Sequence, residues 1–304
     1  MSITARYIKY ILNFKSPSGT SRGILKTKET WFIILQLNDK IGIGETGLFR
    51  GLSFDDVPNY QEKLHWVCEN IHLGLDVLLQ ELTTFPSIQF GLEQAFLSLK
   101  SQTSFELFPT KFTQGKEAIN INGLIWMGDK DFMKSQIKEK LVAGFSCIKM
   151  KIGAIDFETE LSLLKSIRKE FSSNEVVLRV DANGAFKPDE ALEKLEKLAK
   201  FDIHSIEQPI QQGQIEAMAD LCAKTSVPIA LDEELIGIFS SEERQQLLAT
   251  IQPQFIILKP SLLGGFVNSL EWITLATQND CGWWITSALE SNVGLNAIAQ
   301  FTYH

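Results

Sequence analysis

The sequence predicts an α/β protein in which a (β/α) barrel follows an N-terminal α+β unit. The first observation is the length of 304 residues, which suits about two domains. The second is a series of seven short apolar runs in the later part of the chain, about 28 residues apart, with helical patterns between most of them. Third, no G-x-G-x-x-G string opens the first of these units, which favours a closed barrel over an open doubly wound sheet.

The first hundred residues combine strand patterns with helix patterns. Apolar and β-branched residues at 30–37 and a second run at 40–45 flank the Asn-Asp pair at 38–39, which is typical of a β-hairpin. Helical periodicity follows at 60–71 and 87–99. These elements predict an α+β unit that precedes the barrel.

A change of pattern marks the domain boundary. Between 101 and 117 the periodic pattern of apolar residues is lost, and Ser, Thr, Gln, Pro and Gly become frequent. We therefore expect the α+β unit to span 1–112 and the barrel 113–304. The predicted barrel strands are 118–122, 145–151, 176–181, 203–207, 228–232, 255–259 and 283–287. The clearest predicted helices are 156–171, with Asp156 as its N-cap, 189–200 and 266–278.

One glycine-rich string, GIGETG at 42–47, needs separate treatment. It follows the hairpin turn, no helical pattern begins at Gly47, and Val67 stands where a dinucleotide-binding motif would have an acidic residue. We therefore interpret the string as a mobile glycine-rich loop and not as a dinucleotide site.

Composition excludes several classes of protein. Acidic residues outnumber basic ones, 37 to 29, and no run of five or six like charges occurs, so neither a nucleic acid nor a membrane surface is expected as a partner. No apolar stretch approaches 18 residues. Four separate cysteines without a C-x-x-C pair, and no leader pattern before Ile3, predict a cytoplasmic location. With only four histidines, the sequence offers few candidate residues for a zinc site or a Ser-His-Asp triad.

Charged residues end the predicted barrel strands one after another. Side chains alternate between the two faces of a strand. Counting along each strand therefore shows whether the charged residue at its end lies on the face opposite the apolar residues that would meet the helices. The alternation allows all of these ends to point into the barrel mouth, where barrel enzymes hold their active sites. The residues are Lys149, Lys151, Asp181, Glu207, Asp232 and Lys259.

Three of these residues, Asp181, Glu207 and Asp232, are carboxylates on consecutive strands. Strands lie about 4.8 Å apart, so the three could converge within about 10 Å and would repel one another without a cation. Oxygen-only ligands suit Mg²⁺, with Mn²⁺ as the alternative. In the other interpretation each carboxylate caps a helix or pairs with an arginine. Such a role can explain each carboxylate separately. It does not require the three carboxylates to stand 26 and 25 residues apart, as they do here.

The lysines flank the three carboxylates. Lys151 ends the strand before them and Lys259 the strand after, so a substrate held on the metal would have one amine on each face. Lys149 and the metal, as nearby positive charges, would favour the neutral amine that lets Lys151 act as a base. A single lysine at a strand end is more often a solvated side chain, but the paired placement favours chemistry.

Other polar and aromatic residues near the strand ends are assigned structural roles. His204 has the alternation opposite to that of Glu207, so it should face the helices. Trp283 and Trp284 are expected to pack in the core and helix layers.

The motifs at the strand ends resemble those of the enolase superfamily, in its muconate-lactonizing-enzyme-like subgroup. The matching strings are KMK at 149–151, RVDANG at 179–184, EQP at 207–209, ALDE at 230–233 and LKP at 258–260. The resemblance implies an enolase-type barrel and a capping domain whose loops near 16–26 and 44–51 close over the substrate. It also implies proton abstraction beside a carboxylate, with Mg²⁺ on Asp181, Glu207 and Asp232.

Within that subgroup the chain is most similar to the o-succinylbenzoate synthase family. The similar segments are 259–265 and 286–291, and dipeptide epimerases would show D-x-D at 287–289, where Ser-Ala-Leu stands. This resemblance implies Mg²⁺-dependent dehydration of 2-succinyl-6-hydroxy-2,4-cyclohexadiene-1-carboxylate in menaquinone biosynthesis. Lys151 would abstract the proton and then assist the loss of water, Lys259 would stabilise the anionic intermediate, and Lys149 and Ser287 would contact the substrate.

Other functions stay open at this point. The same scaffold hosts N-acylamino acid racemases, and a Schiff-base aldolase using Lys259 is a third enzymatic reading. Relatives continue with an eighth strand, whereas this sequence ends at His304, so we expect that strand to be absent and the sequence to be truncated. An inactive barrel that serves as a binding protein is therefore a further alternative. The oligomeric state is not predicted.

Overall fold

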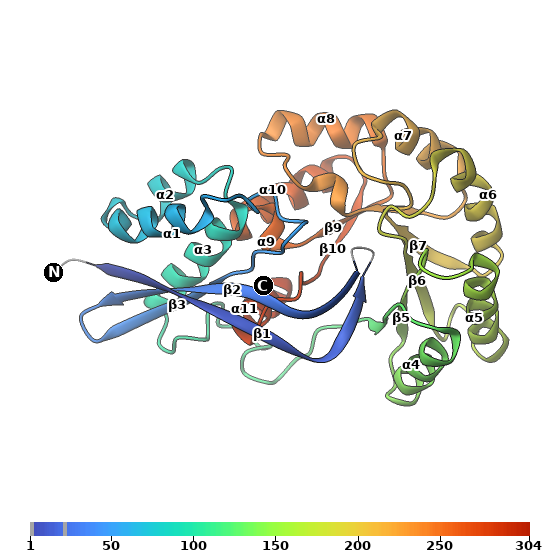
Figure 1. The fold of residues 1–304 in the computed structure, drawn as a ribbon, viewed down its shortest axis with the longest axis horizontal. Coiled ribbons are helices and arrows are strands. Elements are labelled where there is room, and N and C mark those ends of the chain that lie inside the picture. Colours follow the sequence, from blue (N-terminus) through green and yellow to red (C-terminus); the bar gives the residue numbers. More distant parts are fainter. Residues whose placement is uncertain (1–2, 21–22) are drawn as a thin grey trace.

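The computed structural model describes residues 3–20 and 23–304. An N-terminal unit of one antiparallel sheet and several helices lies beside a curled parallel sheet whose outer face is covered by helices (Figure 1). This is the α/β fold that the sequence predicts, a barrel-type sheet with an N-terminal α+β unit. No helix among the described residues is both long and apolar enough to cross a membrane.

The N-terminal unit contains a three-stranded antiparallel sheet in the order β1-β2-β3. β1 is Thr4–Thr20, β2 is Gly23–Leu37 and β3 is Lys40–Thr46. The predicted hairpin is confirmed as β2 and β3, and Asn38 adopts the left-handed φ of 55° that the turn requires. The long strand β1 was not predicted. The β1–β2 hairpin extends toward the parallel sheet (Figure 1).

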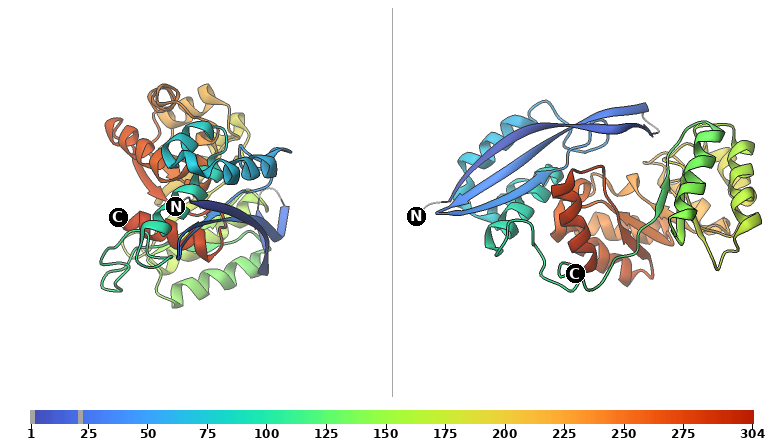
Figure 2. Two further views of the ribbon diagram at one scale, coloured as in Figure 1. Left: turned by 90° about the vertical axis from the view of Figure 1, so that its left-hand side faces the viewer. Right: turned by 90° about the horizontal axis from the view of Figure 1, so that it is seen from below.

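Helices cover one face of this sheet (Figure 2). The predicted helical stretches are confirmed as α1 and α3, and the latter packs directly on β3. The helical elements of this unit are α1 (Tyr60–Glu69), η1 (Ile71–Leu73), α2 (Leu75–Glu81) and α3 (Pro86–Lys100). Pro86 occupies the first turn of α3, where its missing N–H costs no hydrogen bond.

The glycine-rich string has a packing role. Gly42 and Gly44 lie inside β3, and a Cβ at Gly44 would overlap the carbonyl oxygen of Gly91 on α3. A Cβ at Gly42 would overlap the carbonyl oxygen of Ala95 in the same way. The prediction of a mobile loop here is therefore wrong, because these glycines let a helix approach a strand at backbone distance.

The second sheet is parallel and has seven strands in the described residues, in the order β10-β9-β8-β7-β6-β5-β4. Six of the predicted strands are found within two residues of their predicted starts, but the run at 118–122 is irregular and β4 begins only at Gly123. The strands are β4 (Gly123–Ile125), β5 (Cys147–Lys151), β6 (Val177–Asp181), β7 (Ile203–Glu207), β8 (Ile229–Leu231), β9 (Phe255–Leu258) and β10 (Gly282–Ile285). Among the described residues β4 and β10 form the two edges.

Helices follow the parallel strands and cover the outer face of the sheet (Figure 1). The predicted cap at Asp156 is confirmed, since its side chain accepts a hydrogen bond from the N–H of Thr159. The helices are α4 (Lys130–Val142), α5 (Phe157–Glu170), α6 (Pro188–Ala199), α7 (Ile215–Lys224), η2 (Glu233–Leu235), α8 (Ser241–Ile251), α9 (Pro260–Leu263), α10 (Gly265–Gln278) and α11 (Asn292–Tyr303).

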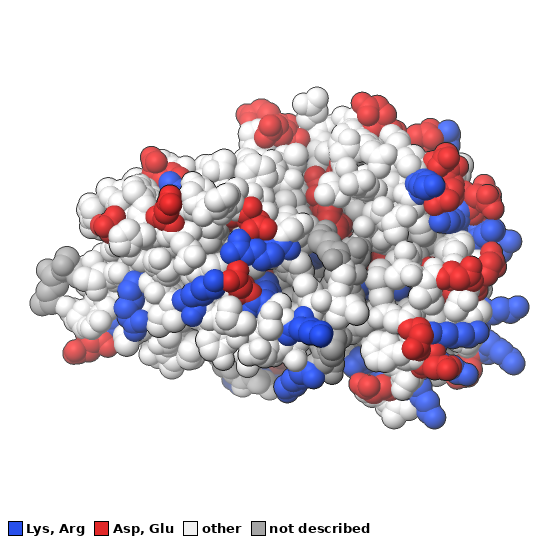
Figure 3. All heavy atoms as spheres, in the orientation of Figure 1, with Lys and Arg blue, Asp and Glu red and all other residues white. Residues whose placement is uncertain are grey.

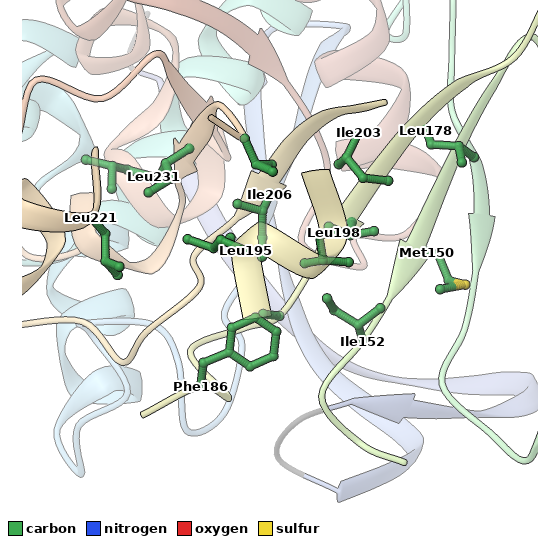
Figure 4. Close-up of a cluster of buried hydrophobic side chains, with 14 of the residues drawn as sticks. Met150, Ile152, Leu178, Phe186, Leu195, Leu198, Ile203, Ile206, Leu221 and Leu231 are labelled. Atoms are coloured by element: carbon green, nitrogen blue, oxygen red, sulfur yellow. The ribbon is translucent and has the colours of Figure 1, made fainter. Parts of the chain in front are cut away.

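The largest core lies between the parallel sheet and these helices. Strand residues such as Ile203 and Ile206 pack with Leu195 and Leu198 of α6 (Figure 4). Each fully buried leucine or isoleucine contributes about 1.5–3 kcal/mol. Acidic and basic side chains are interspersed on the outer surface of the helices (Figure 3). The alternation of apolar and charged residues along each strand therefore places the apolar set against the helices and leaves the charged set for the inner face.

Two buried carboxylates join the N-terminal unit to the parallel unit. Glu45 of β3 accepts hydrogen bonds from Ser291 N, at 2.9 Å, and Gly294 N, at 2.8 Å, at the start of α11. Glu93 of α3 accepts from Val267 N, at 3.0 Å, near the start of α10. Unpaired N–H groups and the helix dipole make helix N-termini favourable for negative charge. The two units are thus held together at the ends of the last two long helices.

We predict that Gly44→Ala destabilises the protein by at least about 2 kcal/mol, because the new methyl group overlaps the backbone of α3. The measurement is urea unfolding followed by circular dichroism. Lys40→Ala, at an exposed position on the same strand, is the control and should change the free energy of unfolding by less than about 0.5 kcal/mol. Equal midpoints for the two variants would show that Gly44 has no packing role.

Candidate active site

The structure brings together the charged residues that the sequence places at the strand ends. Lys151 is the register partner of Asp181 on the next strand, and Asp181 is the partner of Glu207 on the strand after. Asp232 directly follows β8, and Lys259 directly follows β9. All of them lie at or next to the carboxyl ends of consecutive parallel strands, as predicted.

Ion pairs link these residues into one row. Lys149 Nζ lies 2.9 Å from Asp181 Oδ2 and also contacts Glu207. Lys259 contacts Asp232, and its Nζ lies 3.9 Å from Glu207 Oε1. The amines of Lys149 and Lys259, which belong to the flanking strands, therefore reach in between neighbouring carboxylates. All three carboxylates are buried, so this pairing supplies the neutralisation that burial demands.

Lys151 has its own set of partners. Its Nζ lies 2.8 Å from Asp181 Oδ2 and 2.6 Å from Asn183 Oδ1. The Asn183 amide in turn donates to Glu233 Oε1, at 3.0 Å. The amine is thus held by two acceptors from the end of β6.

The pKa values follow from burial and from this pairing. Burial alone would raise the pKa of Asp181, but three neighbouring lysines outweigh it and lower the pKa. Burial and the negative charge of Asp181 raise the pKa of Glu207 to about 8. Burial would lower the pKa of Lys149 and Lys259, but their carboxylate partners raise both. The two lysines are therefore held as cations.

The carboxylates fit a hard divalent cation by their chemistry. In residues 3–20 and 23–304 no group of three His, Cys, Asp or Glu side chains is already clustered around one point, because lysine amines lie between the carboxylates. Glu207 Oε1 is nevertheless buried without a hydrogen-bond partner. An orphaned carboxylate oxygen beside two further carboxylates is an oxygen-only donor set of the kind that Mg²⁺ takes.

A cavity of about 480 Å³ opens onto this row. Its charged lining residues are Lys149, Lys151, Arg179, Asp181, Glu233 and Lys259. Its other walls come from residues 119–126 around β4, from β10 and the loop after it, from α11 and from the N-terminal unit. They mix apolar and polar side chains, among them Phe49, Leu52, Trp126, Trp284, Ile285, Ser287 and Ile298. A volume of this size suits a small-molecule ligand.

The N-terminal unit contributes to the cavity as the resemblance implies. Phe49 and Leu52, just beyond β3, line it, and Phe54 packs edge-on against Phe239 of the parallel unit at 4.8 Å between ring centroids. The other segment expected to cover the site, 16–26, belongs largely to the β1–β2 hairpin, and residues 21–22 lie outside the described residues.

Arg179 is a cavity residue to which the sequence analysis gave no role. Its guanidinium lies 4.1 Å from the ring centroid of Trp284, and its buried Nε has no hydrogen-bond partner. The sequence could have indicated that Arg179 points toward the site, because Arg179 shares a strand face with Asp181. Asn183 was also missed as a partner of Lys151, although it stands in the quoted RVDANG string. Its left-handed φ of 44° turns the chain back toward the row.

The predictions for His204, Trp283 and Trp284 are wrong. The β6–β7 register pairs Leu178 with Ile203 but Arg179 with Ser205, so β7 has a bulge that reverses its alternation. His204 therefore lies on the inner face, where it stacks on Phe255 at 5.1 Å and meets Trp284. Trp283 and Trp284 both line the cavity and do not pack in the core, and Trp283 is 40% exposed.

Comparisons with known proteins agree with this geometry. The family model described as enolase C-terminal domain-like matches residues 133–304. The chain is 44% identical to the o-succinylbenzoate synthase of Desulfotalea psychrophila, over 97% of this chain and 89% of that enzyme. The chain belongs to the enolase superfamily. The resemblance drawn from the strand-end motifs is thereby confirmed, including the similarity to the o-succinylbenzoate synthase family.

Solved structures of the enolase superfamily share the fold. The crystal structure of MenC from Desulfotalea psychrophila matches with a TM-score of 0.88 and 41% identity, over 100% of this chain and 91% of that one. The muconate lactonizing enzyme from Pseudomonas fluorescens matches with a TM-score of 0.81 and 20% identity, over 99% and 85%. The L-Ala-D/L-Glu epimerase of Bacillus subtilis is 25% identical over 61% of this chain and 50% of the epimerase.

Removal of a lysine from the row should be costly. We predict that Lys149→Met lowers the free energy of unfolding by about 3 kcal/mol without added metal, because the buried Asp181 carboxylate loses a cation and Glu207 loses a hydrogen-bond donor. Urea unfolding at pH 7 measures the change. Lys165→Met, at an exposed position on α5, is the matched control. A loss no larger than that of the control would mean that the row contributes no stability.

Proposed function

We propose that this protein is an o-succinylbenzoate synthase. It would remove water from 2-succinyl-6-hydroxy-2,4-cyclohexadiene-1-carboxylate to form 2-succinylbenzoate in menaquinone biosynthesis. The observation that carries the proposal is the placement of Lys151 and Lys259 at opposite ends of a row of carboxylates beside one cavity. The 44% identity to a relative named as an o-succinylbenzoate synthase supports the choice of reaction within the superfamily.

The reaction needs a base on one side of the substrate and a positive charge on the other. Lys151, as the neutral amine, would take the proton from the carbon next to the ring carboxylate, and the electron pair left behind would move into an enediolate. The hydroxyl group would then leave, taking the proton from Lys151 as water, and the ring becomes aromatic. Lys259, which is held as a cation, would stabilise the negative charge of the intermediate.

Asp181, Glu207 and Asp232 would hold Mg²⁺, or Mn²⁺ in its place. When bound, the ion supplies positive charge close to the carboxylate of the substrate. The lysine amines that reach in between these carboxylates keep three negative groups together in the absence of metal, so the donors already lie on adjacent strands.

Substrate binding would involve both charge and shape. Lys149 would attract the ring carboxylate, and Ser287 at the end of the last strand would contact the succinyl arm; both residues line the cavity. The apolar side chains in the cavity walls suit the carbon ring of the substrate. We place the reaction in the cytoplasm, where the free Cys68, Cys147, Cys222 and Cys281 would stay reduced.

We expect Lys151→Ala to lower kcat/KM for dehydration by at least about 10³-fold, because the base is removed. The measurement follows the change in ultraviolet absorbance as the product aromatises, with Lys165→Ala as the control. Retained turnover in Lys151→Ala would refute the assigned base. Absence of dehydration in the unmodified protein, together with deuterium exchange at the α-carbon of an N-acylamino acid, would assign the site to a racemase.

Metal removal should abolish the same activity. We expect EDTA treatment to eliminate dehydration and Mg²⁺ to restore it, whereas Asp232→Asn should require a much higher Mg²⁺ concentration because one anionic ligand is lost. Isothermal titration with Mg²⁺ gives a second readout that is independent of turnover. Full activity in EDTA would contradict the assignment of the three carboxylates as metal ligands.

A further inference from the structure

Gln208 is a fully buried polar residue next to the row of charged residues. It directly follows Glu207 at the end of β7, and its exposed fraction is 0%. It is not among the described residues that line the cavity. Its φ of 38° lies in the left-handed region that a residue with a Cβ rarely adopts. A backbone in this region persists only where the surrounding contacts impose it.

The backbone of Gln208 turns away from the β7–β8 ladder. Gln208 N still donates to Ala230 O, at 2.9 Å, as a residue of that ladder would. In a parallel ladder the next bond would run from Asp232 N to the carbonyl oxygen of Gln208. That oxygen instead accepts from Gly184 N, at 2.7 Å, in the segment that follows Asp181. The turn at Gln208 therefore ties the end of β7 to the end of β6, and it takes a backbone acceptor away from Asp232.

The side chain of Gln208 supplies the acceptor that its backbone withdraws. Its Oε1 accepts from Asp232 N, at 3.2 Å, and from Glu234 N, at 3.3 Å. Its Nε2 donates to Ile210 O, at 3.1 Å, and to Glu234 Oε2, at 2.9 Å. A side-chain amide has two donor hydrogens and an oxygen with two lone pairs, so the whole hydrogen-bonding capacity of this amide is used. One side chain thereby fixes the end of β8 on the end of β7.

Glu234 links the same two strand ends a second time. It follows β8, its side chain is buried, and its Oε1 accepts from Gly213 N, at 2.8 Å, in the loop after β7. Its other oxygen is the one that receives the amide of Gln208. An apolar side chain at position 208 would leave Asp232 N and the carboxylate of Glu234 without a partner in a buried place, which is costly. The network therefore constrains position 208 through its hydrogen bonds and not only through its volume.

We propose that Gln208 is a positioning residue that sets the spacing of Asp181, Glu207 and Asp232. It follows Glu207 directly, its carbonyl holds the segment after Asp181, and its amide holds the backbone of Asp232. Mg²⁺ demands ligands at nearly ideal octahedral positions, and groups that orient such ligands change metal affinity without touching the ion. Gln208 thus determines the affinity of the site for Mg²⁺. The inference rests on the proposed function in one respect, namely that these three carboxylates bind the ion.

The test compares Gln208→Met with Gln212→Met, an exposed position in the loop after β7. Methionine is similar in length to glutamine but cannot replace the amide as a partner of Asp232 N and Glu234 N. Hydrogen exchange of the metal-free protein, followed by mass spectrometry, should be at least about tenfold faster at 231–236 in Gln208→Met and unchanged in α5. In isothermal titration the Kd for Mg²⁺ should rise at least about tenfold. Gln212→Met should match the unmodified protein in both.

Two further variants separate positioning from general stability. The double variant Gln208→Glu/Glu234→Gln keeps the net charge and reverses the bond between the two side chains, while the new carboxylate at 208 still accepts from Asp232 N. Its Kd for Mg²⁺ should stay within about threefold of that of the unmodified protein, and it serves as the test if Gln208→Met does not fold. Met218→Ala, which truncates a buried side chain on α7, should lower the stability and leave the Kd unchanged.

Several results would overturn the proposal. They are a Kd unchanged in Gln208→Met, a loss of affinity in Met218→Ala as large as in Gln208→Met, a double variant that binds Mg²⁺ as weakly as Gln208→Met, and unchanged exchange at 231–236. If the unmodified protein binds no Mg²⁺, the assignment of the metal ligands fails, and the exchange at 231–236 alone decides whether Gln208 fixes Asp232.

Discussion

The pairing of lysines with carboxylates along one edge of the parallel sheet is the interaction on which the site depends. Three buried carboxylates on consecutive strands would repel one another, and Lys149, Lys151 and Lys259 neutralise them. Each lysine can do so only if its strand keeps register with its neighbour. The helices on the outer face and the apolar core beneath them maintain that register, so the fold is a precondition of the charge pattern.

The same interactions prepare the chemistry. Asp181, Glu207 and Asp232 follow one another on three adjacent strands, and Glu207 Oε1 has no hydrogen-bond partner, with the Lys259 amine 3.9 Å away. The row ends with one amine on each side. An arrangement with a base at one end and a fixed cation at the other suits proton abstraction followed by stabilisation of an anion.

The cavity is completed by residues from both structural units. Glu45 and Glu93 bind the N-termini of α11 and α10, and these contacts bring Phe49 and Leu52 against the parallel sheet. Lys28 of β2 is buried in the same unit, where its Nζ donates to Gly47 O at 3.4 Å. The charged row itself lies entirely on the parallel unit.

Much of the site was predictable because a strand has a period of two residues. Lys149, Lys151 and Asp181 could be placed on the inner face by counting, and the spacing of the strands brought Glu207 and Asp232 beside them. Counting failed at His204, where one extra residue in β7 reverses the alternation, since a bulge depends on the neighbouring strand. The extent 1–112 for the N-terminal domain stays a prediction.

The sequence by itself determined the fold class, the order of the parallel strands and the charged residues at their ends, because these follow from local periodicity. Only the tertiary structure decided the contacts between distant segments. Gly42 and Gly44 looked like a flexible loop until α3 was seen packed against them. Glu45 received no role from the sequence, yet it accepts hydrogen bonds from Ser291 N and Gly294 N of the parallel unit. Such pairings depend on how two units dock, and local sequence patterns do not encode that.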